Sequence, residues 1–135
     1  MSDEPATDQA RVDAGGIAFA MRYRDDIAGD EGLCIEVRAD VEGQDTELLR
    51  FDCFRVAPHY HYGPEADDER LMLDLTAAGD SLDWTLNVFE RGRLRSMIER
   101  AGYESVAFGL NEHEVAEAMP RVVNAAREIV EGRQG

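Results

Sequence analysis

The sequence predicts an α+β domain, in which an antiparallel sheet of four to five strands carries two C-terminal helices on one face. Two observations favour this class. Apolar and polar residues alternate through much of the chain before residue 77, which is the pattern of half-buried strands. From residue 80 onward the apolar residues recur at helical spacing instead. Strands followed by helices are typical of a sheet covered by helices.

Four segments show the alternation of a strand: 17–24, 33–41, 47–54 and 71–76. The turn at residues 42–45 is too short for a crossover, so the second and third segments should form an antiparallel hairpin. Leu49 and Phe51 share one face of this hairpin, and we expect them to face the helices. Residues 103–108 are a candidate fifth strand.

The first predicted helix begins at a cap, Asp80 or Ser81, and carries an apolar stripe as far as Ile98. Gly92 weakens the middle of this helix, and Gly102 is placed to end it with a left-handed residue.

The second predicted helix follows Asn111, which has Glu114 at the spacing of a capping box. Pro120 lies inside the apolar stripe of this helix. We therefore expect a kink there, or a further helix that starts at the proline.

The 135 residues fit a single domain, which we place at residues 17–132, after a flexible N-terminal tail at residues 1–16. The polar N-terminus does not read as a secretory signal, and no apolar run is long enough for a membrane helix. We therefore expect a cytoplasmic protein. Cys34 and Cys53 lie in predicted strands and should be reduced, buried thiols.

The net charge is −15, and all 14 basic residues are arginines. Binding to nucleic acid or to an anionic membrane surface is disfavoured, since each needs a positive face. The carboxylates are scattered along the whole chain, which favours a solvated acidic surface. The functional alternative is an acidic inhibitor or antitoxin-like protein that occupies a basic protein partner.

The segment at residues 51–64 concentrates two of the three histidines with aromatic residues and prolines. His59 and His61 are two apart, so in an extended segment their imidazoles point to the same side. Such a pair can chelate a divalent transition metal, and Glu65 follows at a suitable distance. A further ligand would come from Asp52, His113 or a second subunit.

His59, His61 and Glu65 form a His-x-His-x-x-x-Glu pattern that resembles the core of the first metal-binding motif of cupins. The glycines of that motif are replaced by Cys53 and Met72, and no second histidine motif follows. The helical C-terminal half also conflicts with an all-β barrel. The cupin fold is therefore rejected, and the ligand geometry is kept.

The alternative interpretation of the His-Tyr-His-Tyr run is structural. Tyr60 and Tyr62 alternate with the histidines and can line a sheet edge or a homodimer contact. We prefer this interpretation, because two histidines without a clear third and fourth ligand make an incomplete zinc site. Pairing of Cys53 with His59 as nucleophile and base is disfavoured, since Cys53 falls on an apolar strand face.

The Phe-Asp-Cys-Phe and Pro-His-Tyr-His-Tyr elements within residues 49–64 are similar to those of a small family of uncharacterised prokaryotic proteins. This resemblance implies no activity and assigns no catalytic residue. The preferred hypothesis is a non-enzymatic domain that acts through an oligomer or partner interface. The alternatives are a metal-binding protein or metal-dependent enzyme that uses His59 and His61, and an acidic inhibitor of a basic protein.

Overall fold

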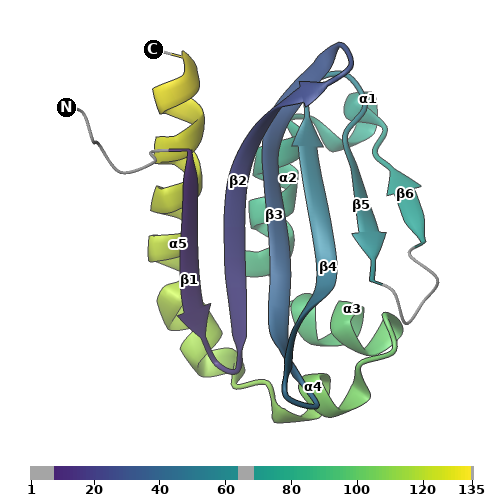
Figure 1. Ribbon diagram of the computed structural model, residues 1–135, viewed down its shortest axis with the longest axis vertical. Helices are drawn as coiled ribbons and strands as arrows, with labels where there is room; N and C mark the ends of the chain where they lie inside the picture. Colours follow the sequence, from purple (N-terminus) through teal and green to yellow (C-terminus); the bar gives the residue numbers. More distant parts are fainter. Residues whose placement is uncertain (1–7, 64–68, 135) are drawn as a thin grey trace.

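The computed structural model describes residues 8–63 and 69–134, which form one antiparallel sheet with helices on one of its faces (Figure 1). The six strands are neighbours in chain order, so the sheet is a simple meander. They are β1 (Gln9–Ala14), β2 (Ile17–Ile27), β3 (Asp30–Val41), β4 (Gln44–Phe54), β5 (His59–Tyr62) and β6 (Arg70–Met72). The predicted α+β class is confirmed, with six strands in place of four to five.

Strand β1 lies in the segment that we expected to be a tail. It pairs with β2 through a tight turn that joins Ala14 to Ile17. Residues along β1 alternate between exposed and half-buried, so it is an amphipathic edge strand. The domain therefore begins before residue 17, and residues 1–7 lie outside the described part of the chain.

The predicted hairpin of β3 and β4 is confirmed. The strands pair antiparallel, and Val41 lies opposite Gln44. The two turn residues, Glu42 and Gly43, have φ of 53° and 84°. Two consecutive positive φ angles match the right-handed twist of the strands, which is why a glycine suits this turn.

Strand β4 contains a bulge that the sequence pattern did not predict. Val37 lies opposite Leu49 but Arg38 lies opposite Glu47, so Leu48 is an extra residue. Leu48 is fully buried rather than sharing the face of the polar residues of β4. The bulge also shifts the alternation of the residues before it. As a result, the Glu47 carboxylate lies 3.5 Å from the guanidinium of Arg50.

The first predicted helix is two helices, α2 (Ser81–Glu90) and α3 (Leu94–Arg100), preceded by a short α1 (Leu75–Ala78). Asp80 caps α2 by accepting a hydrogen bond from the backbone of Asp83. The break falls at Gly92, whose φ is 74°. A left-handed residue cannot continue a helix, so the glycine that we expected to weaken the helix in fact divides it.

The candidate fifth strand at residues 103–108 is wrong, because Glu104–Gly109 form the short helix α4. Helix α5 (Glu112–Gln134) is continuous and includes Pro120, so no separate helix starts at the proline. Asn111 accepts a hydrogen bond from the backbone N–H of Glu114, which confirms the predicted cap.

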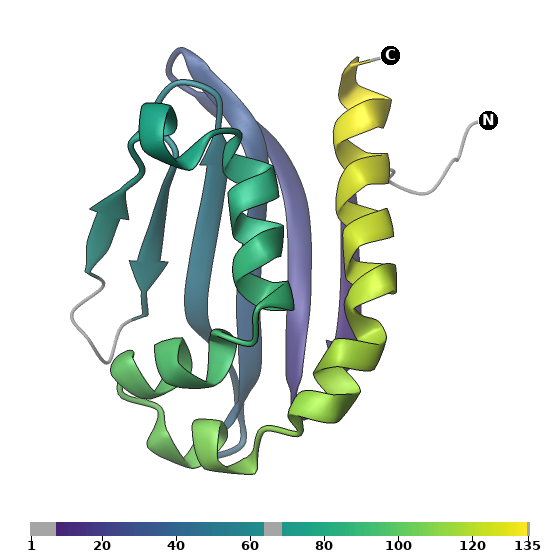
Figure 2. The same ribbon diagram turned by 180° about the vertical axis from the view of Figure 1, so that it is seen from behind.

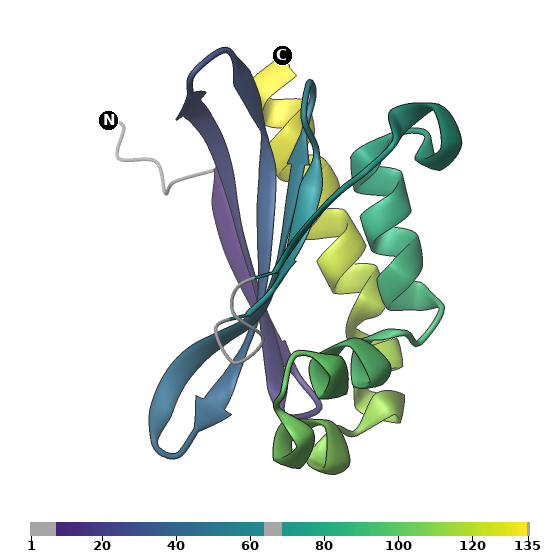
Figure 3. The same ribbon diagram turned by 90° about the vertical axis from the view of Figure 1, so that its right-hand side faces the viewer.

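The helices cover one face of the sheet (Figures 2 and 3). Phe89 of α2 joins the two layers, since its ring lies 5.2 Å from both Phe19 and Phe51. Leu49 and Phe51 are buried on this helical face, as predicted. The opposite face, which we call the open face, carries polar and charged side chains. Among the described helices, none is both long and apolar enough to cross a membrane.

Asp30 fixes the loop that leads into β5. Its carboxylate accepts hydrogen bonds from the backbone of Val56 and Ala57, at 2.9 and 2.8 Å. It also accepts one from the backbone of Glu31. Burial acts to raise the pKa of Asp30, but these N–H groups outweigh burial and hold the pKa below its usual value. Asp30 therefore ties the start of β3 to the chain just before the histidines.

We expect Asp30→Ala to lower the free energy of unfolding by about 2 kcal/mol at neutral pH, because three backbone donors lose a charged acceptor. The pKa of Asp30 is lowered in the folded state, so its stabilisation is present above the unfolded pKa of about 4 and is lost as pH falls. The variant should therefore lose less stability than the parent between about pH 5 and about pH 3.

Urea unfolding at several pH values measures both effects. Glu128→Ala, an exposed carboxylate of α5, is the matched control and should change neither the stability nor its acid dependence. An equal acid loss in Asp30→Ala and in the parent protein would show that Asp30 does not hold the loop in this way.

Candidate metal centre

The histidine pair lies on β5, between β4 and β6, with its side chains on the open face. In the β4–β5 pairing, Asp52 lies opposite His59 and Arg50 lies opposite His61. Residues directly opposite each other share a face, so these four polar side chains gather on one side of the sheet. The expected alternation within β5 is present, with the histidines on one face and the tyrosines on the other.

Asp52 is the centre of the cluster. Its Oδ2 lies 2.8 Å from His59 Nε2 and 3.3 Å from His61 Nε2. One ligand-type atom from each of the three residues lies within 4.8 Å of the others. The side chains are largely withdrawn from solvent, with exposures of 3% for Asp52, 8% for His61 and 12% for His59. The three residues therefore form a pre-assembled, buried set of one carboxylate and two imidazoles.

A contact with the backbone fixes the orientation of the His59 ring. Its Nδ1 lies 2.8 Å from the carbonyl oxygen of Ala57, which can only accept a hydrogen bond, so Nδ1 carries a proton. Nε2 is thereby directed at Asp52. A backbone carbonyl behind one ring nitrogen, with the other nitrogen turned toward the site, is the usual arrangement of a metal-binding histidine.

Arg50 contacts both Asp52 and His61. Its Nε lies 3.2 Å from Asp52 Oδ2, and its Nη2 lies 2.8 Å from His61 Nε2. A guanidinium can only donate, so the lone pair of His61 Nε2 accepts this hydrogen bond and Nε2 carries no proton. Glu47 also contacts the guanidinium, at 3.5 Å. Arg50 thus supplies the positive charge that faces Asp52.

Asp52 Oδ1 is buried and has no hydrogen-bond partner among the described residues. An unpartnered carboxylate oxygen is costly in a protein interior, because it loses its hydration without replacement. Cys34 lies opposite Asp52 on β3. Burial, followed by the negative charge of Asp52, raises the pKa of the Cys34 thiol, so this cysteine is protonated. A hydrogen bond between this thiol and the Asp52 carboxylate contributes to the same rise in pKa, so Cys34 is a weak donor beside the cluster.

Two other predicted ligands are not placed in this cluster. His113 is exposed near the start of α5 and pairs with Glu117 at 3.2 Å. Glu65 lies outside the described residues. Asp52 is the residue that joins the histidines. It was one of several residues from which we expected a further ligand.

The two tyrosines pack within their own chain. The ring of Tyr60 stacks on Phe51 and contacts Trp84, with ring centroids 5.7 and 5.4 Å apart. Tyr62 is buried beneath the guanidinium of Arg100, which lies 3.9 Å from the centre of its ring. These contacts anchor β5 to the helical face and hold the histidines on the other.

Cys53 is also remote from a catalytic arrangement. It faces the helices, where its thiol donates to the Thr85 hydroxyl at 3.4 Å. Burial raises the pKa of Cys53 to about 12, so the thiol is protonated and inert at neutral pH. Cys34 and Cys53 are both free, and they lie on opposite faces of the sheet.

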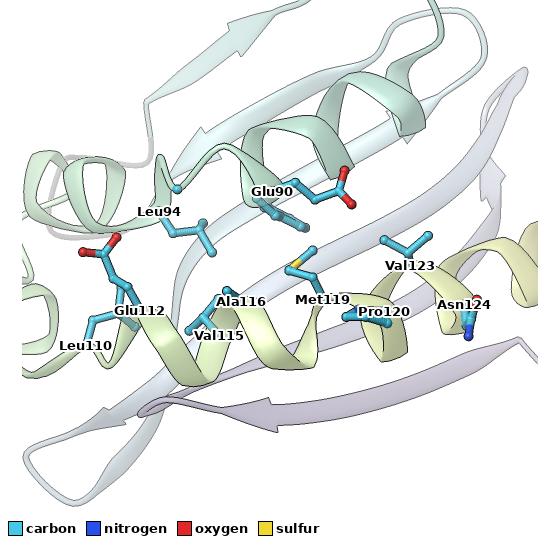
Figure 4. A pocket seen from close by; sticks show the side chains of 12 residues that line it. Glu90, Leu94, Leu110, Glu112, Val115, Ala116, Met119, Pro120, Val123 and Asn124 are labelled. Carbon is cyan, nitrogen blue, oxygen red and sulfur yellow. The ribbon is translucent and has the colours of Figure 1, made fainter.

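A cleft of about 450 Å³ separates α5 from α2 and α3 (Figure 4). Its walls include Leu94 and Met119, both largely buried core residues, with the carboxylates of Glu90 and Glu112 at its edge. Glu112 is already paired with Arg95 at 2.9 Å. Nothing in this cleft matches the Asp52 cluster in its convergence of ligand atoms.

Comparison with known protein families gives one match, over residues 11–126, to a family described as a domain of unknown function (DUF7700). No curated protein and no solved structure matches the chain significantly. The matched range includes the whole Asp52 cluster and the five strands from β2 to β6. Because the match covers well over half of the residues, the chain belongs to this family of domains of unknown function.

Proposed function

We propose that this domain binds a divalent transition metal, with zinc as the leading candidate, through Asp52, His59 and His61. The observation that carries the proposal is the convergence of both histidine Nε2 atoms on one buried carboxylate oxygen. Two imidazoles and a carboxylate are ligands that zinc and related divalent ions accept.

The distances support this ligand set. Zinc holds nitrogen and oxygen ligands at about 2.0–2.1 Å, so neighbouring ligand atoms in a tetrahedral site lie about 3.3 Å apart. Asp52 Oδ2 and His61 Nε2 are 3.3 Å apart, and the contact to His59 Nε2 is shorter at 2.8 Å. Small side-chain rotations would therefore open the cluster enough to admit an ion.

The chemistry of each ligand also supports the site. Nε2 of His61 already carries no proton, and His59 is held with Nε2 forward by the Ala57 carbonyl. Asp52 supplies negative charge and a second oxygen that has no partner among the described residues. Three protein ligands leave a fourth position for water, for a substrate, or for Glu65, which we keep as a proposed ligand.

A partner interface is a second proposal, and exposed apolar side chains favour it. Phe108 on α4 is 88% exposed, Val56 is 68% exposed and Met72, opposite His59, is 55% exposed. Contiguous apolar patches mark contact surfaces, and Met72 is the one of these three side chains that lies beside the histidines. A homodimer remains our proposal for the assembly, and the acidic surface keeps a basic protein partner as a further proposal. We keep a cytoplasmic location as an expectation from the sequence.

The metal proposal predicts that untagged protein takes up one zinc ion per chain. His59→Ala, His61→Ala and Asp52→Asn should each weaken zinc binding at least tenfold, because each removes a direct ligand. The measurement is metal content after dialysis, with affinity from competition against a chelator. His113→Ala is the matched control and should bind zinc like the parent. Equal zinc content in all four variants would contradict the proposal.

The double variant His59→Ala with His61→Ala separates the metal site from an interface at the same strand. If the histidines hold metal, the variant should lose zinc and keep the oligomeric state of the parent, since the ligands converge within one chain. Light scattering coupled to size exclusion measures that state. A shift from dimer to monomer, in a parent that contains no metal, would favour the interface instead.

A further inference from the structure

We propose that the ion at this site takes a carboxylate-bearing ligand, and that Arg50 is the protein group that binds the other side of that carboxylate. This inference rests on the proposed metal site and adds the chemical class of the molecule that completes it. It is carried by the position of Arg50, by the charges around the cluster and by the direction in which the cluster opens.

With the ion bound, the guanidinium of Arg50 would lie next to it and would have N–H groups without a hydrogen-bond acceptor. Its Nη2 now donates to His61 Nε2 at 2.8 Å. An ion that takes the lone pair of Nε2 ends this hydrogen bond. The nearby Glu47, 3.5 Å from Nη1, limits how far the side chain can move away. Arg50 would therefore keep N–H groups beside an open coordination position.

The net charge of the metal-loaded site favours the binding of a further negative group. Asp52 and Glu47 supply two negative charges, whereas Arg50 and a divalent ion supply three positive charges. The other acid on this part of the open face, Glu36, pairs with Arg38 at 2.5 Å, and Arg38 also pairs with Asp45 at 3.1 Å. One excess positive charge remains among these four groups. Arg70, which lies opposite His61 on β6, adds positive charge on the same face, so the site favours an anion.

A carboxylate fits this place better than a phosphate. A planar guanidinium binds a carboxylate through two parallel N–H···O bonds, and one oxygen of the same carboxylate can reach the metal. Arg50 alone offers too few donors to surround a phosphate, and the nearby Arg70 on β6 is exposed to solvent.

The way into the cluster passes Arg50. Its side chain is 28% exposed, against 3% for Asp52 and 8% for His61, so solvent reaches the cluster from the side of the guanidinium. A surface hollow of about 460 Å³ lies on the open face one strand away. Cys34 and Glu36, which pair with Asp52 and Arg50 across β3 and β4, line it. A small carboxylic acid could lie there with its head group at the ion.

The test uses full-length protein loaded with Co²⁺, whose visible absorption reports changes in coordination. Metal content is measured first, so that failure of the metal site is seen separately from failure of this inference. Acetate should then change the spectrum in a saturable way, and chloride at equal ionic strength should not. Inorganic phosphate should bind at least tenfold more weakly than acetate.

The decisive comparison is between variants at saturating Co²⁺. Arg50→Gln should weaken acetate binding at least tenfold, because it removes the two-point donor. Arg50→Lys should weaken it less, since the charge remains, and it carries the test if Arg50→Gln does not fold. Arg121→Gln, an exposed arginine of α5, makes the same change in net charge and should bind acetate like the parent.

Three results would overturn the inference. The first is no response of the metal-loaded protein to acetate. The second is binding of acetate to Arg50→Gln with the affinity of the parent, and the third is tighter binding of phosphate than of acetate. In each case the measured metal content would leave the proposed metal site standing. Absence of Co²⁺ uptake in the parent would overturn both proposals together.

Discussion

The buried carboxylate of Asp52 is the constraint on which the rest of the open face depends. A carboxylate that is 3% exposed must be compensated, since removing one partner from a buried ion pair typically costs about 3–5 kcal/mol. Arg50, His59 and His61 converge on a single oxygen of this group. The other oxygen has no partner among the described residues. Before an ion binds, Asp52 and Glu47 together exceed the charge of Arg50 by one negative charge, and one carboxylate oxygen has no partner in the described part of the chain, which is why a cation is the natural addition.

Contacts on both faces of the sheet hold this cluster in place. On the helical face, Tyr60 and Tyr62 are fixed by aromatic and cation–π contacts, and these contacts set the rotation of β5. Strand alternation then directs His59 and His61 to the open face. The entry to β5 is held by Asp30, and the carbonyl of Ala57 orients His59 in turn. The positions of the ligands thus follow from packing on the face they do not occupy.

The sequence predicts the parts of this structure that depend on local rules. Alternation on both sides of a two-residue turn predicts the β3–β4 hairpin, and the faces of Leu49 and Phe51 follow from it. The spacing of His59 and His61 predicts that their side chains share one side. Local rules do not place β5 against β4, because the connecting loop allows several registers. The partnership of Asp52 with the histidines depends on that register, so it emerges in the structure.

The errors of prediction have separate physical causes. Residues 103–108 have β-branched and aromatic side chains, but their packing favours helix α4, so tertiary contacts outweigh local propensity. Gly92 adopts a left-handed conformation and divides one apolar stripe into two helices. Strand β1 is polar and has a weak hydrophobic pattern, so its sequence predicts a tail. Its pairing with β2 shows that it is a strand. Leu48 occupies a bulge, which shifts the alternation by one residue.

X-ray absorption at the zinc edge of untagged, zinc-loaded protein tests the central claim most directly, because it reports the atoms bound to the ion. The account predicts a shell of nitrogen and oxygen at about 2.0–2.1 Å, with the multiple scattering of two imidazoles. Sulfur is not expected, since the converging ligand set is Asp52, His59 and His61, and Cys53 faces the helices. A sulfur shell at about 2.3 Å, or a shell without imidazole, would contradict the account.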